Sequence, residues 1–346
     1  MSHAPHRGSA LDGGAGRRFF DGGFSTPQSR DAAKDSRVAM LRLGRRLLVG
    51  DGLAANPQEG IALVKAAAES GEAEACNLLA TLTAAGAWTA QSWPRALDLL
   101  VQAAGLGSSD AREQLAILAP GLAPARSSAD WRALRGSIDL ESFVVPPQPR
   151  QISEQPRVWR AEGFATPAQC DRLIARARGK LMPAKMYNRT RGTVQFEAMR
   201  TNSEFLFDIT QSGVVLVLMR VKIGLLVSLP PPHMEPPQIL HYASGQELRA
   251  HFDFLRGDRQ SYGQDGGYSG DRLVTFLLYL NDDYEGGETE FLKTDLRYKG
   301  RRGDALFFAN LKDGKPDPMS LHRGSPVVNG EKWLFSQWIH DRPFTA

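Results

Sequence analysis

A histidine and an aspartate stand two positions apart in ELRAHFDFLRG, residues 247–257, a stretch that is otherwise typical of a strand followed by a turn. Side chains at positions i and i+2 of a strand point to the same side, so His251 and Asp253 can reach one metal ion. Two ligands do not define a metal site. A solvated strand edge explains an isolated H-x-D pair more simply, and a third ligand must come from elsewhere.

A second histidine is the ligand that this pair lacks. The chain has seven histidines, and those outside the N-terminal tail and this pair are His233, His241, His322 and His340. His322 precedes the last predicted strand, and Lys332 follows it ten residues later. Two histidines and one carboxylate form the facial triad of non-haem Fe(II) oxygenases, which leaves coordination positions open. These four histidines remain candidates for the second histidine ligand, although a loop position is the simpler account of His233 and a packed or surface position that of His241.

The elements that must position these ligands are short strands. From residue 238 onward, runs rich in β-branched and aromatic residues alternate with Gly, Asn and Asp: QILHYA, RLVTFLLYLN, ETEFL, DALFFAN and KWLFSQWIH. This spacing predicts an antiparallel β-sandwich or jelly roll with helices packed outside. In the last run, alternation places Lys332, Leu334, Ser336 and Trp338 on one face. A lysine on the inner face is costly without an anion, so an inward Lys332 implies one.

The N-terminal part of the chain repeats with a period of 36 residues. The segment KAAAESGEAEACNLLATL (65–82) aligns with VQAAGLGSSDAREQLAIL (101–118), and alanines, a glycine and leucines match at that constant offset. Small residues where helices touch, with apolar residues at i, i+3 and i+4, predict stacked helical hairpins. Residues 36–120 resemble the Sel1-like branch of the tetratricopeptide superfamily. Since such solenoids commonly bind proteins, the resemblance implies a recruitment surface.

Composition supplies the remaining boundaries, within an α+β fold class. Residues 1–35 lack any structural period and the apolar core of a signal peptide, so we expect a disordered tail. Residues 121–156 are Pro-rich, which predicts a linker with one short helix near Trp131. Residues 157–346 then form a second domain. The chain of 346 residues is long enough for two domains.

The bulk charge and the cysteines favour a cytoplasmic protein. The net charge of +4 is scattered, with no concentrated basic stripe, so we expect neither nucleic acid nor membrane as a partner. The apolar run 213–232 is interrupted by Arg220 and Lys222 and stopped by prolines, which argues against a membrane span. Cys76 and Cys170 lie far apart and belong to no C-x-x-C pair, which favours free thiols in a reducing compartment.

Six motifs in order resemble the prolyl 4-hydroxylase family of Fe(II)- and 2-oxoglutarate-dependent dioxygenases over residues 157–342. They are Y-x-x-G-Q (242–246), H-x-D (251–253), RLVTFLLYLN (272–281), YEGGETEF (284–291), GDALFF (303–308) and HRGSPVVNGEKW (322–333). The resemblance implies a double-stranded β-helix that binds Fe(II), 2-oxoglutarate and O2. It also implies hydroxylation of a peptidyl residue, proline first, with release of succinate and CO2, and ascorbate as the agent that re-reduces iron.

The same resemblance implies roles for individual residues, and it implies that His251, Asp253 and His322 bind the metal. Lys332 and Tyr242 are expected to contact 2-oxoglutarate, and Thr275 and Tyr279, which share one strand face, to line its pocket. The expected contacts to a peptide substrate are Arg200, Glu235, Arg272, Trp338 and His340. For His340, a strand-end hydrogen bond is the alternative. The Gly-rich segment 259–271 predicts a mobile loop over the site.

Two departures from the family pattern keep other functions open. Leu248 stands where many members have an aromatic residue, and Asn202 replaces a commoner serine. The same oxygenase chemistry could therefore act on another side chain, a free amino acid or a natural product. In a further alternative the protein is an adaptor with a silent barrel, but a decayed site would be expected to lose at least one of its four key residues, all of which are present.

Overall fold

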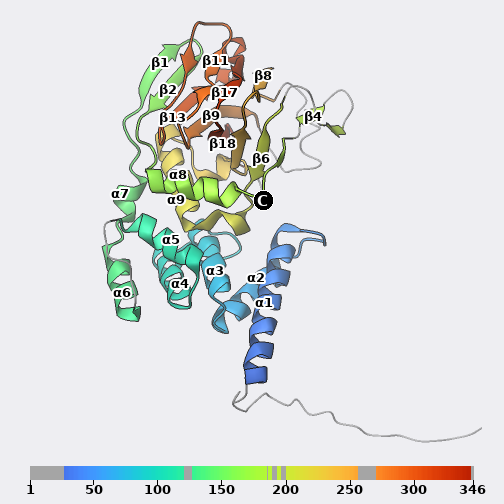
Figure 1. Cartoon of the computed structure of the whole chain (residues 1–346), viewed down its shortest axis with the longest axis vertical. Coiled ribbons are helices and arrows are strands. Elements are labelled where there is room, and N and C mark those ends of the chain that lie inside the picture. Colours follow the sequence, from blue (N-terminus) through green and yellow to red (C-terminus); the bar gives the residue numbers. More distant parts are fainter. Residues whose placement is uncertain are drawn as a thin grey trace, which may run out of the picture.

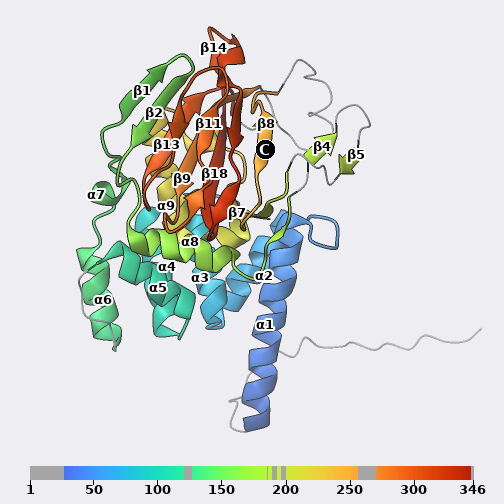
Figure 2. The ribbon, with the colours of Figure 1, turned by 45° about the horizontal axis from the view of Figure 1, so that its top comes forward.

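The computed structural model describes residues 27–120, 127–184, 186–188, 193–195, 200–255 and 270–343. An N-terminal layer of helices supports a sheet-rich C-terminal part, as expected for an α+β protein (Figure 1). The helices α8 and α9 lie between the two layers (Figure 2). The first 26 residues of the predicted tail and most of the predicted loop 259–271 lie outside the described residues.

The N-terminal layer consists of antiparallel helical hairpins. Its helices are α1 (Pro27–Val49), α2 (Pro57–Glu69), α3 (Ala73–Ala85), α4 (Trp93–Gly105), α5 (Ser109–Leu118), α6 (Ser128–Ser137) and α7 (Leu140–Val144). Helices α2 and α4 begin 36 residues apart, as do α3 and α5, so the sequence period reappears as helix positions. Asn56 and Ser92 are the N-caps of α2 and α4 and accept hydrogen bonds from backbone N–H groups. The repeated cap explains why each hairpin starts where it does.

Several expected boundaries differ in the structure. Residues 27–35, expected in the tail, form the first turns of α1. The range 121–156, expected as a linker, contains α6, α7 and the strand β1 (Arg150–Glu154), which pairs with β2 (Arg157–Ala161). The sheet therefore starts inside the predicted linker, because the backbone groups of β1 find partners on β2. Proline composition alone does not reveal such pairing.

The helical layer is fused to the sheet-rich part through a buried polar network. Arg172 on α8 (Pro167–Ala177) is buried and forms ion pairs with Asp110 at 2.8 Å and Glu113 at 2.9 Å, both on α5. The side chain of Asn77 donates to Asp110 at 2.7 Å, and Gln114 accepts from the backbone N–H of Val215 on α9 (Ile209–Val227). Apolar residues of both layers also form one continuous core. The two sequence regions therefore pack as one body.

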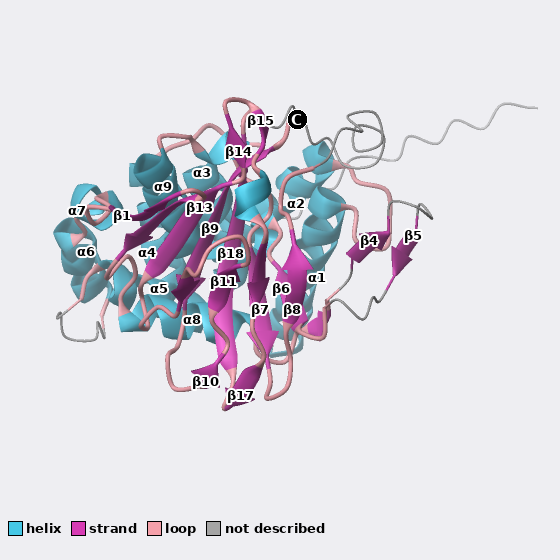
Figure 3. Cartoon of the chain, turned by 90° about the horizontal axis from the view of Figure 1, so that it is seen from above, coloured by secondary structure: helices cyan, strands magenta, loops and turns pink. Residues whose placement is uncertain are grey.

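Two sheets face each other above the helices (Figure 3). The larger sheet has the order β1, β2, β13 (Ala305–Ala309), β9 (Arg272–Tyr279), β18 (Lys332–His340), β7 (Gln238–Tyr242), β6 (Ser203–Leu206) and β3 (Met182–Pro183). The smaller sheet has the order β12 (Arg297–Tyr298), β11 (Thr289–Phe291), β16 (His322–Gly324) and β8 (Leu248–His251). Two-stranded pairs complete the described strands: β10 (Glu285–Gly286) with β17 (Val327–Asn329), β14 (Leu311–Lys312) with β15 (Lys315–Pro316), and β4 (Met186–Asn188) with β5 (Thr193–Gln195).

Alternation along the central strands separates two cores. On β9, Leu277 and Tyr279 belong to the core between the sheets, whereas Phe276 and Leu278 belong to the core against the helices. Phe291 on β11 meets Phe308 on β13 edge to face, with ring centroids 5.1 Å apart. Because successive side chains of a strand point to opposite faces, the central strands contribute residues to both cores.

Helix α9 is the one helix among the described residues that is long and apolar enough to cross a membrane by length and composition. Within the fold, 56% of its most apolar stretch is buried, and it packs against α3. Its two cations, Arg220 and Lys222, donate to the carbonyl oxygens of Met234 and Phe164 at 3.0 and 2.8 Å. Such burial and hydrogen bonding are typical of a helix in the core of a folded protein.

Candidate metal centre and active-site pocket

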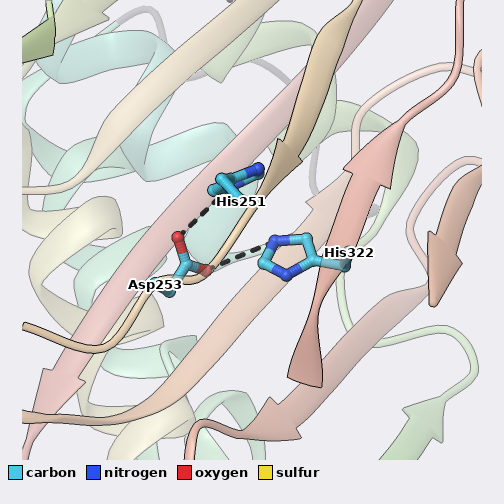
Figure 4. A group of neighbouring side chains, drawn as sticks. All are labelled: His251, Asp253 and His322. Carbon is cyan, nitrogen blue, oxygen red and sulfur yellow. Dashed lines mark ion pairs between the residues drawn. The ribbon is translucent and has the colours of Figure 1, made fainter. Parts of the chain in front are cut away.

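The three predicted metal ligands converge in the structure. His251 on β8 and His322 on β16 are direct cross-strand partners, and Asp253 follows β8 by two residues (Figure 4). The Nε2 atoms of His251 and His322 each lie 3.5 Å from a carboxylate oxygen of Asp253. The three potential ligand atoms lie within 4.8 Å of one another. One small cation can therefore contact all three.

Backbone carbonyl groups fix the tautomers of both histidines. Nδ1 of His251 lies 2.8 Å from the carbonyl oxygen of Arg249, and Nδ1 of His322 lies 2.9 Å from that of Ser320. A carbonyl oxygen can only accept, so each Nδ1 carries a proton and each Nε2 is the ring nitrogen that faces Asp253. Histidines that ligate metals are commonly oriented in this way.

The electrostatics of the cluster keep the ligands in their binding protonation states. Burial by itself raises the pKa of a carboxyl group, but the adjacent His322 and His251 hold the pKa of Asp253 well below its usual value. Burial, reinforced by His251, lowers the pKa of His322 to about 4. At neutral pH the site therefore offers an ionised carboxylate and a neutral buried imidazole, which are the donors that a divalent metal requires.

The cluster opens into a cavity of about 490 Å³ between the two sheets. Four residues of β18 line it, namely Lys332, Leu334, Ser336 and Trp338. The predicted alternation along this strand is confirmed. Sequence reasoning missed several polar residues that line the cavity, among them Gln238 on β7 of the larger sheet and Thr289 on β11 of the smaller sheet. Their strands were expected, but the sequence does not specify which strands meet at the cavity.

Lys332 is the buried cation at the inner end of this cavity. The side chain is 2% exposed, and Nζ donates to the carbonyl oxygen of Gly287 at 2.7 Å. Among the described residues, no carboxylate forms an ion pair with it. Burial lowers the pKa of Lys332 to about 8. A buried ammonium group beside a cavity, without a protein counter-ion, is suited to a carboxylate of a bound ligand.

The tyrosines and Thr275 have different positions around the cavity. Tyr242 is paired with Lys332 across β7 and β18 and lines the cavity, and burial raises the pKa of its hydroxyl group to about 12. Tyr279, predicted to line the pocket, is instead fully buried behind it and shares a hydrogen bond of 2.9 Å with Thr289. Thr275 lines the cavity as predicted, and its hydroxyl group donates to Oδ2 of Asp253 at 2.7 Å.

The five predicted substrate contacts separate into two groups. Arg200, Arg272 and Trp338 line the cavity. Glu235 and His340 are buried behind Arg272, where Glu235 accepts from both guanidinium arms at 2.6 and 3.1 Å and lies 2.7 Å from Nε2 of His340. These two residues hold Arg272 rather than face the cavity, because packing directs them into the protein.

Trp338 carries the clearest unused donor of the cavity wall. The guanidinium carbon of Arg272 stacks 3.4 Å from the ring centroid of Trp338. The indole N–H of Trp338 and the side-chain amide of Gln238 have no acceptor among the described residues. Both residues line the cavity, but the two nitrogen atoms are themselves buried, so a ligand would reach them only after a small shift of these side chains.

Comparison with known proteins identifies the family of this chain. Residues 237–340 match the 2OG-Fe(II) oxygenase superfamily. A probable prolyl 4-hydroxylase 4 of Arabidopsis thaliana is 34% identical over 220 residues, which cover 57% of this chain and 72% of that protein. A probable prolyl 4-hydroxylase 6 of the same plant is 36% identical over 224 residues, covering 59% and 76%. The chain belongs to the prolyl 4-hydroxylase family.

Among solved structures, the 2OG complex of a viral collagen prolyl hydroxylase from Paramecium Bursaria Chlorella virus-1 is 27% identical to this prolyl 4-hydroxylase family member. The two structures align over 53% of this chain and 94% of the viral chain, with a TM-score of 0.41.

The donor set of this prolyl 4-hydroxylase family member fits Fe(II). Two neutral imidazole nitrogens and one carboxylate oxygen can occupy one face of the ion and leave other positions open. His251, Asp253 and His322 would hold the iron, and Lys332 would bind a carboxylate of 2-oxoglutarate. The protein is accordingly a 2-oxoglutarate-dependent dioxygenase.

Proposed function

We propose that the protein hydroxylates a peptidyl proline, with 2-oxoglutarate and O2 as co-substrates and with release of succinate and CO2. The observation that carries this proposal is the joint presence, in one cavity, of the two-histidine, one-carboxylate cluster and a buried lysine that forms no ion pair with any described residue. The names of the Arabidopsis relatives, prolyl 4-hydroxylases, support proline as the target.

The residues around the metal cluster would bind and orient the co-substrate. Iron and 2-oxoglutarate together supply the oxidation of the substrate carbon when both are bound. Lys332 binds the far carboxylate of 2-oxoglutarate, and the buried ring of Tyr242 lies beside the same ammonium group, whose Nζ is 5.3 Å from the ring centroid. Burial between the sheets excludes water and strengthens these contacts.

A peptide would bind at the open side of the cavity. Trp338 and Gln238 line this cavity, and their buried N–H groups, which lack an acceptor among the described residues, would bind peptide carbonyl groups if the side chains shift to meet them. Arg272 provides a flat guanidinium face, which Glu235 and His340 hold in place. The charges at this wall are matched within the protein, since Arg200 also lies near Glu204 at 3.5 Å. A locally neutral peptide segment is therefore the expected ligand.

The architecture extends the proposal beyond the site. The two facing sheets would be a double-stranded β-helix, and helices α2 to α5, with starts repeating every 36 residues, would be Sel1-like repeats that recruit or position a protein substrate. We propose a cytoplasmic location, in line with two free, buried cysteines. Ascorbate would serve as the reductant that restores the iron.

The decisive experiment measures two products at once. Purified protein is incubated with Fe(II), 2-oxoglutarate, ascorbate and a panel of proline-containing peptides, and both succinate and the gain of one oxygen atom on the peptide are determined. We expect both signals from wild type and neither from His251→Ala. Peptides with alanine in place of proline are the matched substrate control.

Other outcomes reassign the function. Succinate release without oxidation of any proline peptide would exclude proline and favour another side chain or a small molecule. If neither succinate release nor binding of 2-oxoglutarate with anaerobic Fe(II) is detected, the adaptor hypothesis takes precedence. In that case the repeats, which a His322→Ala variant leaves intact, would carry the function.

A further inference from the structure

Asp253 receives a hydrogen bond from a residue pair that lies behind the metal cluster. The hydroxyl group of Thr275, on β9, is 2.7 Å from Oδ2 of Asp253. The side-chain nitrogen of Asn310, which follows β13, is 2.9 Å from the same threonine oxygen. Thr275 is 1% exposed and Asn310 is fully buried. Three polar side chains thus form a chain of hydrogen bonds that ends on the carboxylate.

The direction of every proton in this chain is determined. Thr275 Oγ1 accepts from the side-chain nitrogen of Asn310, so its single hydroxyl proton is directed to Oδ2 of Asp253. The same contact orients the amide of Asn310 with its nitrogen toward Thr275. The remaining amide oxygen of Asn310 has no partner among the described residues, so no competing side-chain bond turns the amide away.

The backbone on both sides holds the chain rigidly. The N–H group of Asn310 donates to the carbonyl oxygen of Leu273 at 2.9 Å, and its own carbonyl oxygen accepts from Asp317 at 2.9 Å. Thr275 sits in the centre of the larger sheet, paired with Phe308 on one side and Trp338 on the other. Asp253 itself lies two residues beyond the end of β8, and none of the described strands pairs with it. Side-chain contacts such as that of Thr275 can therefore set the orientation of its carboxylate.

We infer that Thr275, oriented by Asn310, is a positioning residue that locks the carboxylate of Asp253 in its metal-binding orientation and limits it to one-oxygen coordination. The inference rests on the proposed function only in that the cluster binds a divalent metal. Oδ2 is occupied by the threonine hydroxyl group, so a second metal–oxygen bond would compete with a buried hydrogen bond. Partners of metal ligands in this position typically change metal affinity by about 10- to 100-fold when they are removed.

The test is metal affinity, measured without turnover. Mn(II) and Co(II) are titrated anaerobically into the full-length protein by calorimetry, and thermal unfolding is recorded in parallel. Thr275→Val, which keeps the shape but removes the hydroxyl group, should raise the Kd by about 10- to 100-fold, and Thr275→Ser should restore tight binding. Asn310→Leu should weaken binding less than Thr275→Val does. The double variant should bind no more weakly than Thr275→Val, because Asn310 acts through Thr275.

A matched control separates positioning from general stability. Thr81 is also a buried threonine, whose hydroxyl group donates to the carbonyl oxygen of Asn77 at 3.1 Å within α3, far from the metal cluster. Thr81→Val should leave the Kd unchanged. Unchanged metal affinity in Thr275→Val, or no recovery in Thr275→Ser, would overturn the inference, as would a wild-type protein that binds no metal. If Thr275→Val does not fold, the metal Kd of Asn310→Leu is the deciding measurement, and an unchanged Kd would overturn the inference.

The result is distinct from that of the hydroxylation assay. Tight metal binding that depends on Thr275, in a protein that oxidises no proline peptide, would refute the proposed substrate and leave the positioning role standing.

Discussion

Lys332 places a buried positive charge beside apolar side chains of the cavity wall. Leu240, Leu277 and Leu334 line the same cavity, and the ammonium group has one carbonyl partner within hydrogen-bond distance. Removing a charged group from water costs free energy that a single neutral acceptor does not recover. At this position, the negative charge of a bound co-substrate would offset the free energy lost when the ammonium group is buried.

Loss of the charge should therefore weaken 2-oxoglutarate binding selectively. We expect Lys332→Met to raise the KM for 2-oxoglutarate on the order of 10- to 100-fold, which corresponds to one charge-assisted hydrogen bond. Mn(II) affinity should remain, since Lys332 contacts none of the three ligands. Lys315→Met, in the exposed β14–β15 hairpin, is the control. Equal KM values for Lys332→Met and Lys315→Met would contradict the assignment.

The same substitution should stabilise the ligand-free protein. Burial lowers the pKa of Lys332 from 10.5 to about 8, so between these pH values the unfolded chain binds more protons and the unfolding free energy rises with pH. Below pH 8 the burial cost of the charge is fully present. Lys332→Met should therefore raise the unfolding free energy by about 1 to 3 kcal/mol at pH 7.

Urea denaturation at two pH values checks the sign of this effect. The stabilisation by Lys332→Met should be smaller at pH 10, where the wild-type lysine is largely neutral in the fold. A loss of stability at pH 7, or a gain that grows with pH, would show that the ammonium group is already compensated within the protein.

At the scale of elements, helices α5 and α8 are joined by a buried ion-pair cluster. The side chain of Arg172 is 3% exposed and bridges Asp110 and Glu113, while Arg176 also reaches Asp110 at 3.4 Å. Burial by itself would raise the pKa of Asp110, but Arg172 and the Asn77 amide lower it. Each charge depends on its partner, so the contact between the helical layer and the sheet layer is specific.

Removal of Arg172 should be costly for this reason. We expect Arg172→Ala to lower the unfolding free energy by about 1 to 3 kcal/mol, because the partly buried Asp110 would lose its closest cation and keep only Arg176. Asp171→Ala, on the same helix, breaks only an exposed pair with Arg302 and should cost about 0 to 1 kcal/mol. Denaturation of both variants in urea provides the comparison, and similar losses would show that the cluster has no special role.

At the scale of the whole molecule, the helical layer completes the core of the oxygenase. Val214, Val215 and Leu218 of α9 are buried, and α9 packs against α3 of the helical layer. One continuous apolar core extends from Leu41 to Ile339. The proposed recruitment role of the repeats thus coexists with a structural one.

Separation of the layers should consequently disrupt the enzyme. A fragment that starts at residue 145 would expose the apolar face of α9 and leave Arg172 without Asp110 and Glu113. We expect this fragment to lack a cooperative thermal transition and to aggregate, as measured by calorimetry and size-exclusion chromatography. A soluble, cooperatively folding fragment that binds Mn(II) as tightly as the full chain would show that the repeats are an independent module.

Local patterns in the sequence determined the spacing of the candidate metal ligands, the side of the strand on which Lys332 lies and the starts of the repeated helices. The H-x-D spacing, the distant His322 and the alternation that turns Lys332 inward all reappear in the structure. The offset of 36 residues reappears in the starts of the helices. These features depend on short-range periodicity, which a strand or a helix imposes directly on neighbouring side chains.

Only the tertiary structure decided how distant segments share space. It brought Asn310 and Thr275 behind Asp253, moved Glu235 and His340 out of the cavity wall, and placed Tyr279 behind Thr289. It also paired β1 with β2 and fused the helical layer to α9. Strand register, and packing between segments far apart in sequence, fix such contacts, and no local period encodes them.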